Sequence, residues 1–109
     1  MMATLRDIAD VIRSKNSGPF EITFDVIFAN ADRYRHVRDS GMLNPQTVLQ
    51  LYGVPESDLL TCMFFEPALA FKFTLRRHGD QGGVGERDTF GAQQHAPLMT
   101  LEVPAFHGA

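Results

Sequence analysis

The clearest pattern in the chain is an alternation of apolar and polar residues between positions 20 and 28. Its apolar members are Phe20, Ile22, Phe24, Val26 and Phe28. Because successive side chains of a β-strand point to opposite faces, this period of two predicts a strand with one buried face. Residues 70–75 alternate in the same way, with Lys72 and Thr74 between apolar neighbours, and predict a second strand of this kind.

Two further segments are strand candidates on other grounds. Residues 59–65 are almost continuously apolar and are followed by the breaker Glu66-Pro67. Such a run is typical of a strand that is covered on both faces. Residues 98–103 form the last strand candidate.

Helical spacing of apolar residues begins near the N-terminus. Residues 4–13 carry an apolar stripe behind Thr4 and Asp7, which have the spacing of a capping box. This segment predicts a first helix that Gly18-Pro19 prevents from continuing.

Two more helices are predicted between the strands. Asn30 begins one helix, and Gly41 is its expected stop. Asn44 caps another, because Pro45 would then occupy the first helical position, where its missing N–H costs nothing. Gly53 is the expected end of that helix.

This order of elements favours a single α+β domain over residues 1–109. We expect a small antiparallel or mixed sheet with helices on one face, and a ferredoxin-like sandwich is the simplest arrangement. Residues 76–97 have little apolar periodicity and predict a long loop, which in a compact domain is usually functional or disordered.

Composition narrows the partners. The net charge of −3 argues against a nucleic-acid binder, which normally presents a basic face. No apolar stretch approaches a membrane span of roughly 20 residues, and the N-terminus is unlike a signal peptide. Cys62 is the only cysteine, so an internal disulfide is excluded and a buried, inert thiol is expected. We therefore expect a cytoplasmic protein that binds neither nucleic acid nor membrane.

The first candidate site is the polar segment at residues 13–19, predicted as the turn between helix and strand. Arg13 and Lys15 suit a carboxylate or phosphate, and Asn16 and Ser17 add further polar groups. The alternative is a solvated helix end, where the two cations only complement the helix dipole.

The second candidate is Asp25, an unusual residue in the middle of a strand. It could orient Lys15 or His95, or act as a general base if it is desolvated. The alternative is an exposed sheet face. His95 is the side chain best suited to proton transfer, and its neighbours Gln93 and Gln94 could hold a substrate carbonyl or carboxylate. A surface or structural histidine is the competing interpretation.

Standard enzyme motifs are missing from the sequence. It contains no phosphate-binding loop, no H-E-x-x-H and no G-x-S-x-G. The carboxylates are scattered without a metal-binding spacing, so we expect neither a metal nor a cofactor.

Three segments resemble one protein family. Residues 13–25, Phe-Phe-Glu-Pro at 64–67 and residues 88–97, with Gly-Ala-Gln-Gln-His-Ala-Pro at 91–97, are similar to the domain of unknown function 4387 family. Members of that family occur beside, or fused to, proteins of the acyclic terpene utilisation AtuA type. The resemblance implies an accessory subunit or domain that works with an AtuA-type large subunit.

A second resemblance concerns the first polar segment. The C-terminal ferredoxin-fold domain of AtuA-like proteins opens with a helix that ends in an Arg-Ser-Gly-Asp-Lys-Gly type of turn. Arg13, Ser14 and Lys15 match it loosely, while Asn16 and Ser17 stand where that turn has Gly and Asp. This likeness implies the same α+β fold.

Two functions fit these observations. The first is a small subunit that pairs with an AtuA-type protein in the breakdown of carboxylates or acyl-thioesters. In that case Arg13 and Lys15 bind an anionic group while His95 and Asp25 complete a shared site. The second is a stand-alone hydro-lyase or isomerase whose site forms between copies of a homo-oligomer, with His95 moving a proton.

Overall fold

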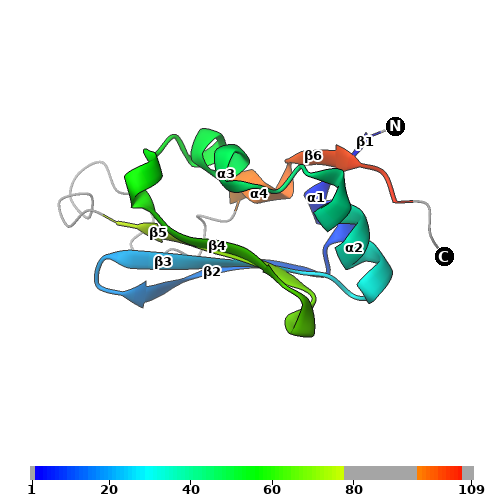
Figure 1. Ribbon diagram of the computed structural model, residues 1–109, viewed down its shortest axis with the longest axis horizontal. Coiled ribbons are helices and arrows are strands. Elements are labelled where there is room, and N and C mark those ends of the chain that lie inside the picture. The colour runs from blue at the N-terminus through cyan, green and yellow to red at the C-terminus, as the bar shows by residue number, and fades with distance from the viewer. Residues whose placement is uncertain (1, 78–95, 107–109) are drawn as a thin grey trace.

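The computed structural model describes residues 2–77 and 96–106, so residues 78–95 of the loop predicted at 76–97 lie outside the description, while its ends belong to β5 and α4. A four-stranded antiparallel sheet carries helices on one side, as Figure 1 shows, which confirms the α+β prediction. In chain order the elements are β1 (Met2–Thr4), α1 (Leu5–Ile8), β2 (Val11–Gly18), β3 (Glu21–Ile27), α2 (Ala31–Ser40), α3 (Pro45–Tyr52), η1 (Glu56–Asp58), β4 (Leu59–Phe65), η2 (Glu66–Ala68), β5 (Ala70–Arg76), α4 (Ala96–Met99) and β6 (Glu102–Pro104).

The sheet has the strand order β2-β3-β5-β4, and every neighbouring pair is antiparallel. It consists of two β-hairpins that the helices α2 and α3 connect, and β3 lies beside β5 at its centre. The short strands β1 and β6 form a separate antiparallel pair. The layering is that of the expected sandwich, while the connectivity is hairpin, two helices, hairpin rather than two βαβ units.

The core lies between the sheet and the helices. The rings of Phe24 on β3 and Phe73 on β5 stack with centroids 4.5 Å apart, and Tyr52 of α3 packs against Phe24 at 5.0 Å. Both phenylalanines are fully buried. This aromatic cluster joins the two hairpins to the helical layer.

The predicted ends of α2 and α3 are confirmed. The Asn30 side chain accepts a hydrogen bond from the backbone of Arg33, and Asn44 accepts one from Thr47. Gly41 ends α2 in the left-handed region, where glycine avoids the penalty that a side chain would incur. None of the helices in the described ranges has the length and hydropathy of a membrane span.

The predicted first helix is much shorter than expected. The helix α1 ends at Ile8, and residues from Val11 onward form β2 instead. The Asp10 N–H donates to the Ile27 carbonyl at 2.8 Å, which marks the point where the chain joins the sheet. Val11 and Ile12 are β-branched residues that favour a strand, so pairing with β3 outweighs the helical spacing.

Three other strand predictions need correction. Residues 98–103 do not form one strand, because Leu98 belongs to α4 and only the end of the segment enters β6. The strand β4 is an edge strand that is not covered on both faces, since Met63 is 48% and Phe65 39% exposed. Phe20 lies before β3 and is 54% exposed, although its pattern had placed it on the buried face.

Truncation of Phe24 tests the position of the core. We expect Phe24→Ala to lower the free energy of unfolding by about 3–5 kcal/mol, because it removes a ring from a filled site. Phe20→Ala, the matched control at an exposed position, should change it by less than about 0.5 kcal/mol. Urea denaturation measures both, and equal effects of the two variants would contradict this placement of the core.

Candidate functional site

The helices leave one side of the sheet uncovered in the described part of the chain (Figure 1). We call this side the open face. The strand registers place on it the outward-facing residues Val11, Arg13, Lys15, Ser17, Glu21, Thr23, Asp25, Ile27, Thr61, Met63, Phe65, Ala70, Lys72, Thr74 and Arg76. Four of the predicted site residues, Arg13, Lys15, Ser17 and Asp25, are therefore brought together.

Asp25 forms the centre of a charged row across the sheet. Directly opposite it lie Arg13 on β2 and Lys72 on β5. The Arg13 Nε lies 3.2 Å from Asp25 Oδ2, and the Lys72 Nζ lies 2.9 Å from Asp25 Oδ1. The Asp25 side chain is only 4% exposed, whereas Arg13 is 58% and Lys72 38% exposed. The two cations therefore cover the carboxylate.

The surroundings of Asp25 keep it ionised. Burial by itself disfavours the charged carboxylate, but hydrogen bonds and attraction from Lys72 and Arg13 outweigh burial, so the pKa of Asp25 lies below its ordinary value of 3.8. The sequence analysis had suggested Lys15 as a partner of Asp25. The structure instead pairs Asp25 with Arg13 and Lys72. A carboxylate held this way is a weak proton acceptor, and the geometry suits an anion that fixes two cations better than a general base.

Next to this row lies a ladder of hydroxyl groups. Thr23 Oγ1 donates to Ser17 Oγ at 3.0 Å and lies 3.0 Å from Thr74 Oγ1. Lys15 is directly opposite Thr23 and is exposed. Within the described ranges Lys15 makes no ion pair, so its charge is available to a ligand or a partner.

Asn16 is separated from the other predicted site residues. It lies opposite Ile22, whose side chain is buried beneath the helices, so Asn16 faces the helical side of the sheet. There its Oδ1 accepts a hydrogen bond from Arg77 at 2.7 Å. The predicted polar turn at residues 13–19 is in fact mostly β2, and the strand's alternation divides its side chains between two faces.

The remaining predicted residues have no described position. Gln93, Gln94 and His95 lie outside the described residues, so their expected approach to Lys15 stays a prediction. His36, a weaker histidine candidate, has a structural contact, because its Nε2 lies 2.7 Å from the Pro104 carbonyl oxygen. This contact ties α2 to β6.

Lys72 is a site residue that the sequence analysis missed. The alternation of residues 70–75 identified Lys72 only as a polar position between Phe71 and Phe73. Alternation could show that it faces away from the core, but not that Asp25 lies opposite it. That fact comes from the β3–β5 register.

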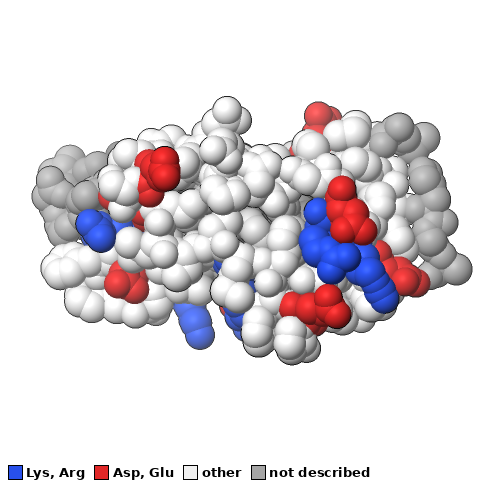
Figure 2. All heavy atoms as spheres, in the orientation of Figure 1, with Lys and Arg blue, Asp and Glu red and all other residues white. Residues whose placement is uncertain are grey.

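The open face is more positive than the chain as a whole. It carries four cations, Arg13, Lys15, Lys72 and Arg76, against the carboxylates of Glu21 and Asp25, whereas the net charge of the chain is −3. Figure 2 shows basic atoms projecting below the sheet. The face therefore suits an anionic ligand or an acidic protein surface.

The described residues include one cysteine and no cluster of potential metal ligands. Within residues 2–77 and 96–106, no three His, Cys, Asp or Glu side chains gather as a metal site requires. Cys62 is half-buried, and burial raises the pKa of its thiol. The thiol is therefore mostly protonated at neutral pH and weakly reactive.

Fold and site together define a small α+β domain with an open, basic sheet face. The family described as Domain of unknown function (DUF4387) matches residues 5–102, so the chain belongs to this family. No curated protein and no solved structure matches the chain significantly.

Replacement of Asp25 tests the charged row. We expect Asp25→Asn to lower the free energy of unfolding at neutral pH by about 1–2 kcal/mol, because two cations lose their counter-charge. Asp25 contributes stability above its ordinary pKa of 3.8 and loses it as the pH falls through its lower folded value. The difference between variant and wild type should therefore shrink below about pH 4.

Asp39→Asn is the matched control for this measurement. Asp39 is 66% exposed and pairs with Arg38 at the surface, so its loss should cost less than about 0.5 kcal/mol. Urea denaturation across the pH range gives both values. A difference between Asp25→Asn and wild type that is the same at neutral and acidic pH would contradict the ionised row.

Proposed function

We propose that the protein is a small accessory subunit that pairs with an AtuA-type large subunit acting on carboxylates or acyl-thioesters. The open face is then the surface that the large subunit covers. Membership of the family supports a subunit role through the resemblance described above. The proposal depends most on one observation, the burial of Asp25 beneath two exposed cations on a sheet face that no helix of the described chain covers.

The row combines a buried carboxylate with two exposed cations. Exposed ion pairs contribute little to stability. Burying the Asp25 carboxylate also has a desolvation cost, which the attraction of the two cations offsets, so the row adds little net stability by itself. Contact with a partner would remove water from the row and strengthen its electrostatic attraction. The fixed guanidinium of Arg13 would then be presented in one geometry, which favours specific recognition.

Apolar residues lie beside the charged row. The strand registers align Val11, Ile27, Ala70 and Phe65 in the neighbouring row across the four strands. Ala70 is fully buried, so the accessible apolar surface comes from the other three. Phe65 and Met63 are among the exposed large apolar residues of the chain. An apolar area next to fixed charges is the composition expected of a protein interface.

The charge of the open face favours a heterologous partner. Two copies stacked through this face would bring like charges together, since cations outnumber carboxylates on it. An acidic patch on another protein would instead complement Arg13 and Lys15. Self-association through the open face is therefore the less favourable arrangement.

Substrate binding fits the same arrangement. Arg13 and Lys15 stand on an open surface, and neither residue lines the cavity at α2–η2 or the one beside α1. A partner that covers the face would convert the surface into a closed site for an anionic group. In this proposal His95, Gln93 and Gln94 complete the site, in the roles inferred from the sequence.

A charge reversal at Lys15 tests the docking surface. We expect Lys15→Glu to weaken binding of the AtuA-type large subunit by at least about tenfold. The new carboxylate would repel the acidic patch that the proposal places on that subunit. Lys15 has no ion pair in the described chain, so folding should be unaffected. Arg6→Glu makes the same charge change on α1 and should leave the affinity within about twofold. Co-purification followed by calorimetry measures the effect.

Two outcomes would contradict the proposal. One is a wild-type chain that shows no affinity for the AtuA-type protein. The other is equal weakening by Lys15→Glu and Arg6→Glu, which would mean that only overall charge matters. A homo-oligomer that turns over a carboxylate alone, and loses activity on His95→Ala, would support the stand-alone enzyme.

A further inference from the structure

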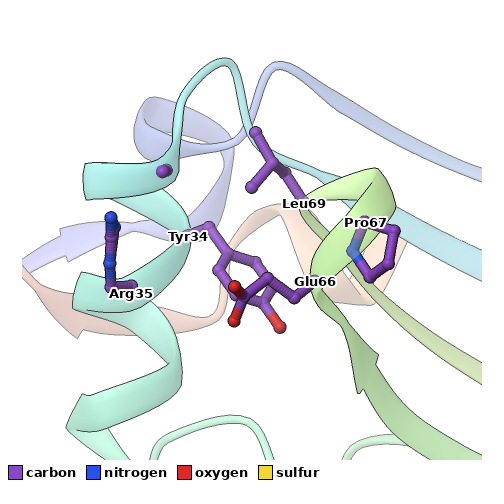
Figure 3. A pocket seen from close by; sticks show the side chains of 6 residues that line it. Tyr34, Arg35, Glu66, Pro67 and Leu69 are labelled. Atoms are coloured by element: carbon purple, nitrogen blue, oxygen red, sulfur yellow. The ribbon is translucent and has the colours of Figure 1, made fainter.

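A separate cavity lies between α2 and η2, and it shares no residue with the open face. Its volume is about 310 Å³, which is room for about ten water molecules. The residues that line it are Ala31, Tyr34, Arg35, Glu66, Pro67 and Leu69. Figure 3 shows α2 on one side of the cavity and η2 on the other, with the Tyr34 ring between them. This size is at the lower end of small-molecule sites.

Tyr34 provides a polar group without a protein partner. Its side chain is nearly fully buried, with 2% exposure. Buried tyrosine hydroxyls normally find a hydrogen-bond partner, yet this hydroxyl has none in the described structure. Because no buried side-chain oxygen or nitrogen atom there lacks a partner, the hydroxyl must reach the accessible surface, and Figure 3 shows it at the end of the ring beside η2.

Positive charge lies on the α2 side of the cavity. Arg35 is exposed and forms no ion pair within residues 2–77 and 96–106. Ala31 is the first residue of α2, so this wall is also at the positive end of the helix dipole. Arg35 follows Ala31 by one helical turn and lies on the same side of α2. A carboxylate fits between these groups.

Glu66 is the negative group at this cavity. Its Oε1 lies 3.3 Å from the Arg38 Nη1, and the Arg38 guanidinium lies 5.6 Å from the centre of the Tyr34 ring. Figure 2 shows basic and acidic groups side by side over α2 and η2. Arg38 also pairs with Asp39, so it is shared between two carboxylates. Of the two charged residues that line the cavity, Glu66 thus has an ion pair within the described residues, whereas Arg35 has none.

The other wall of the cavity is apolar. Leu69 has φ 51, a left-handed conformation that is rare for a residue with a bulky side chain. Its N–H donates to the Glu66 carbonyl and its own carbonyl accepts from Phe28, both at 2.9 Å. Glycine would adopt this backbone at lower cost but would leave the wall without its side chain. Leu69 and Pro67 thus form an apolar surface opposite α2.

We propose that this cavity binds a small aliphatic carboxylate. The carboxylate would lie at Arg35 and the start of α2, and the alkyl chain would pack on Leu69 and Pro67. A phosphate ion would leave the apolar wall unused, and an ammonium ion would face Arg35. The site belongs to this chain alone, so its test does not depend on the AtuA-type partner.

The test uses the full chain and 4-methylpentanoate as the probe. We expect saturable binding, detected by calorimetry and by NMR shifts at Ala31, Arg35 and Leu69. The neutral isostere 4-methylpentanamide, inorganic phosphate and 4-methylpentylamine should each bind at least about tenfold more weakly, because each lacks the charge or the alkyl chain that the site requires.

Three variants separate the roles of the lining residues. Arg35→Gln should weaken binding of the carboxylate by about tenfold or more. Tyr34→Phe should leave binding within about twofold and should not lower stability, because the hydroxyl lies away from Arg35 (Figure 3) and has no partner to lose. Glu66→Gln should leave it unchanged or strengthen it, since a repulsive charge is removed. Arg33→Gln is the matched control on α2, where Arg33 contacts the Ile8 carbonyl at 3.3 Å, and should have no effect.

The proposal is overturned by any of four results. The first is no binding of the carboxylate at tens of millimolar. The second is equal binding of the amide or of phosphate. The third is a preference for the amine together with loss of binding in Glu66→Gln. The fourth is equal weakening by Arg35→Gln and Arg33→Gln, which would indicate a general charge effect.

Discussion

One-sided packing of the four-stranded sheet is the constraint on which the rest of the structure depends. The helices α2 and α3 cover the face that carries Phe24 and Phe73, and these stacked rings fill the core. Since strand side chains alternate, every other residue must then face away from the helices. Asp25, between the buried Phe24 and Val26, is placed on the open face by this rule, and its cations follow from the register of its neighbours.

The sequence was sufficient to predict elements in which the spacing of apolar residues fits either a helix or a strand, but not both. The strands β3 and β5 and the caps of α2 and α3 follow from alternation and from Asn30, Gly41 and Asn44. It was insufficient where a segment fits two periods. Ile12 lies on the apolar stripe of a helix, and equally on the inner face of β2 opposite Val26. Hydrogen bonds to β3 favour the strand over the helix. The spacing of apolar residues within the segment does not reveal these hydrogen bonds, because they form only when the fold brings the two strands together.

The candidate site shows the same limit. Arg13 and Asp25 are 12 positions apart and Lys72 is a further 47 away, so their contact depends on two strand registers. Polarity alone grouped Asn16 with Lys15, whereas the strand separates them onto opposite faces. The α2–η2 cavity was missed because α2 and η2 are distant in sequence. Its best sequence signal was the Glu66-Pro67 pair, noticed only as a chain breaker and through the family resemblance.

The two surfaces differ in the kind of contact they suit, and they adjoin at one point of the chain. The open face is broad, basic and partly apolar, as a protein interface is, whereas the α2–η2 cavity is small and has one free cation in the described structure. Phe65 is the last residue of β4 and belongs to the open face, and Glu66 begins η2 and lines the cavity. A protein that covers Phe65 therefore comes within one residue of the cavity wall. Glu66 contacts Arg38 of α2, and the Leu69 carbonyl accepts from Phe28 directly after β3, so the cavity wall is joined both to the helix and to the sheet.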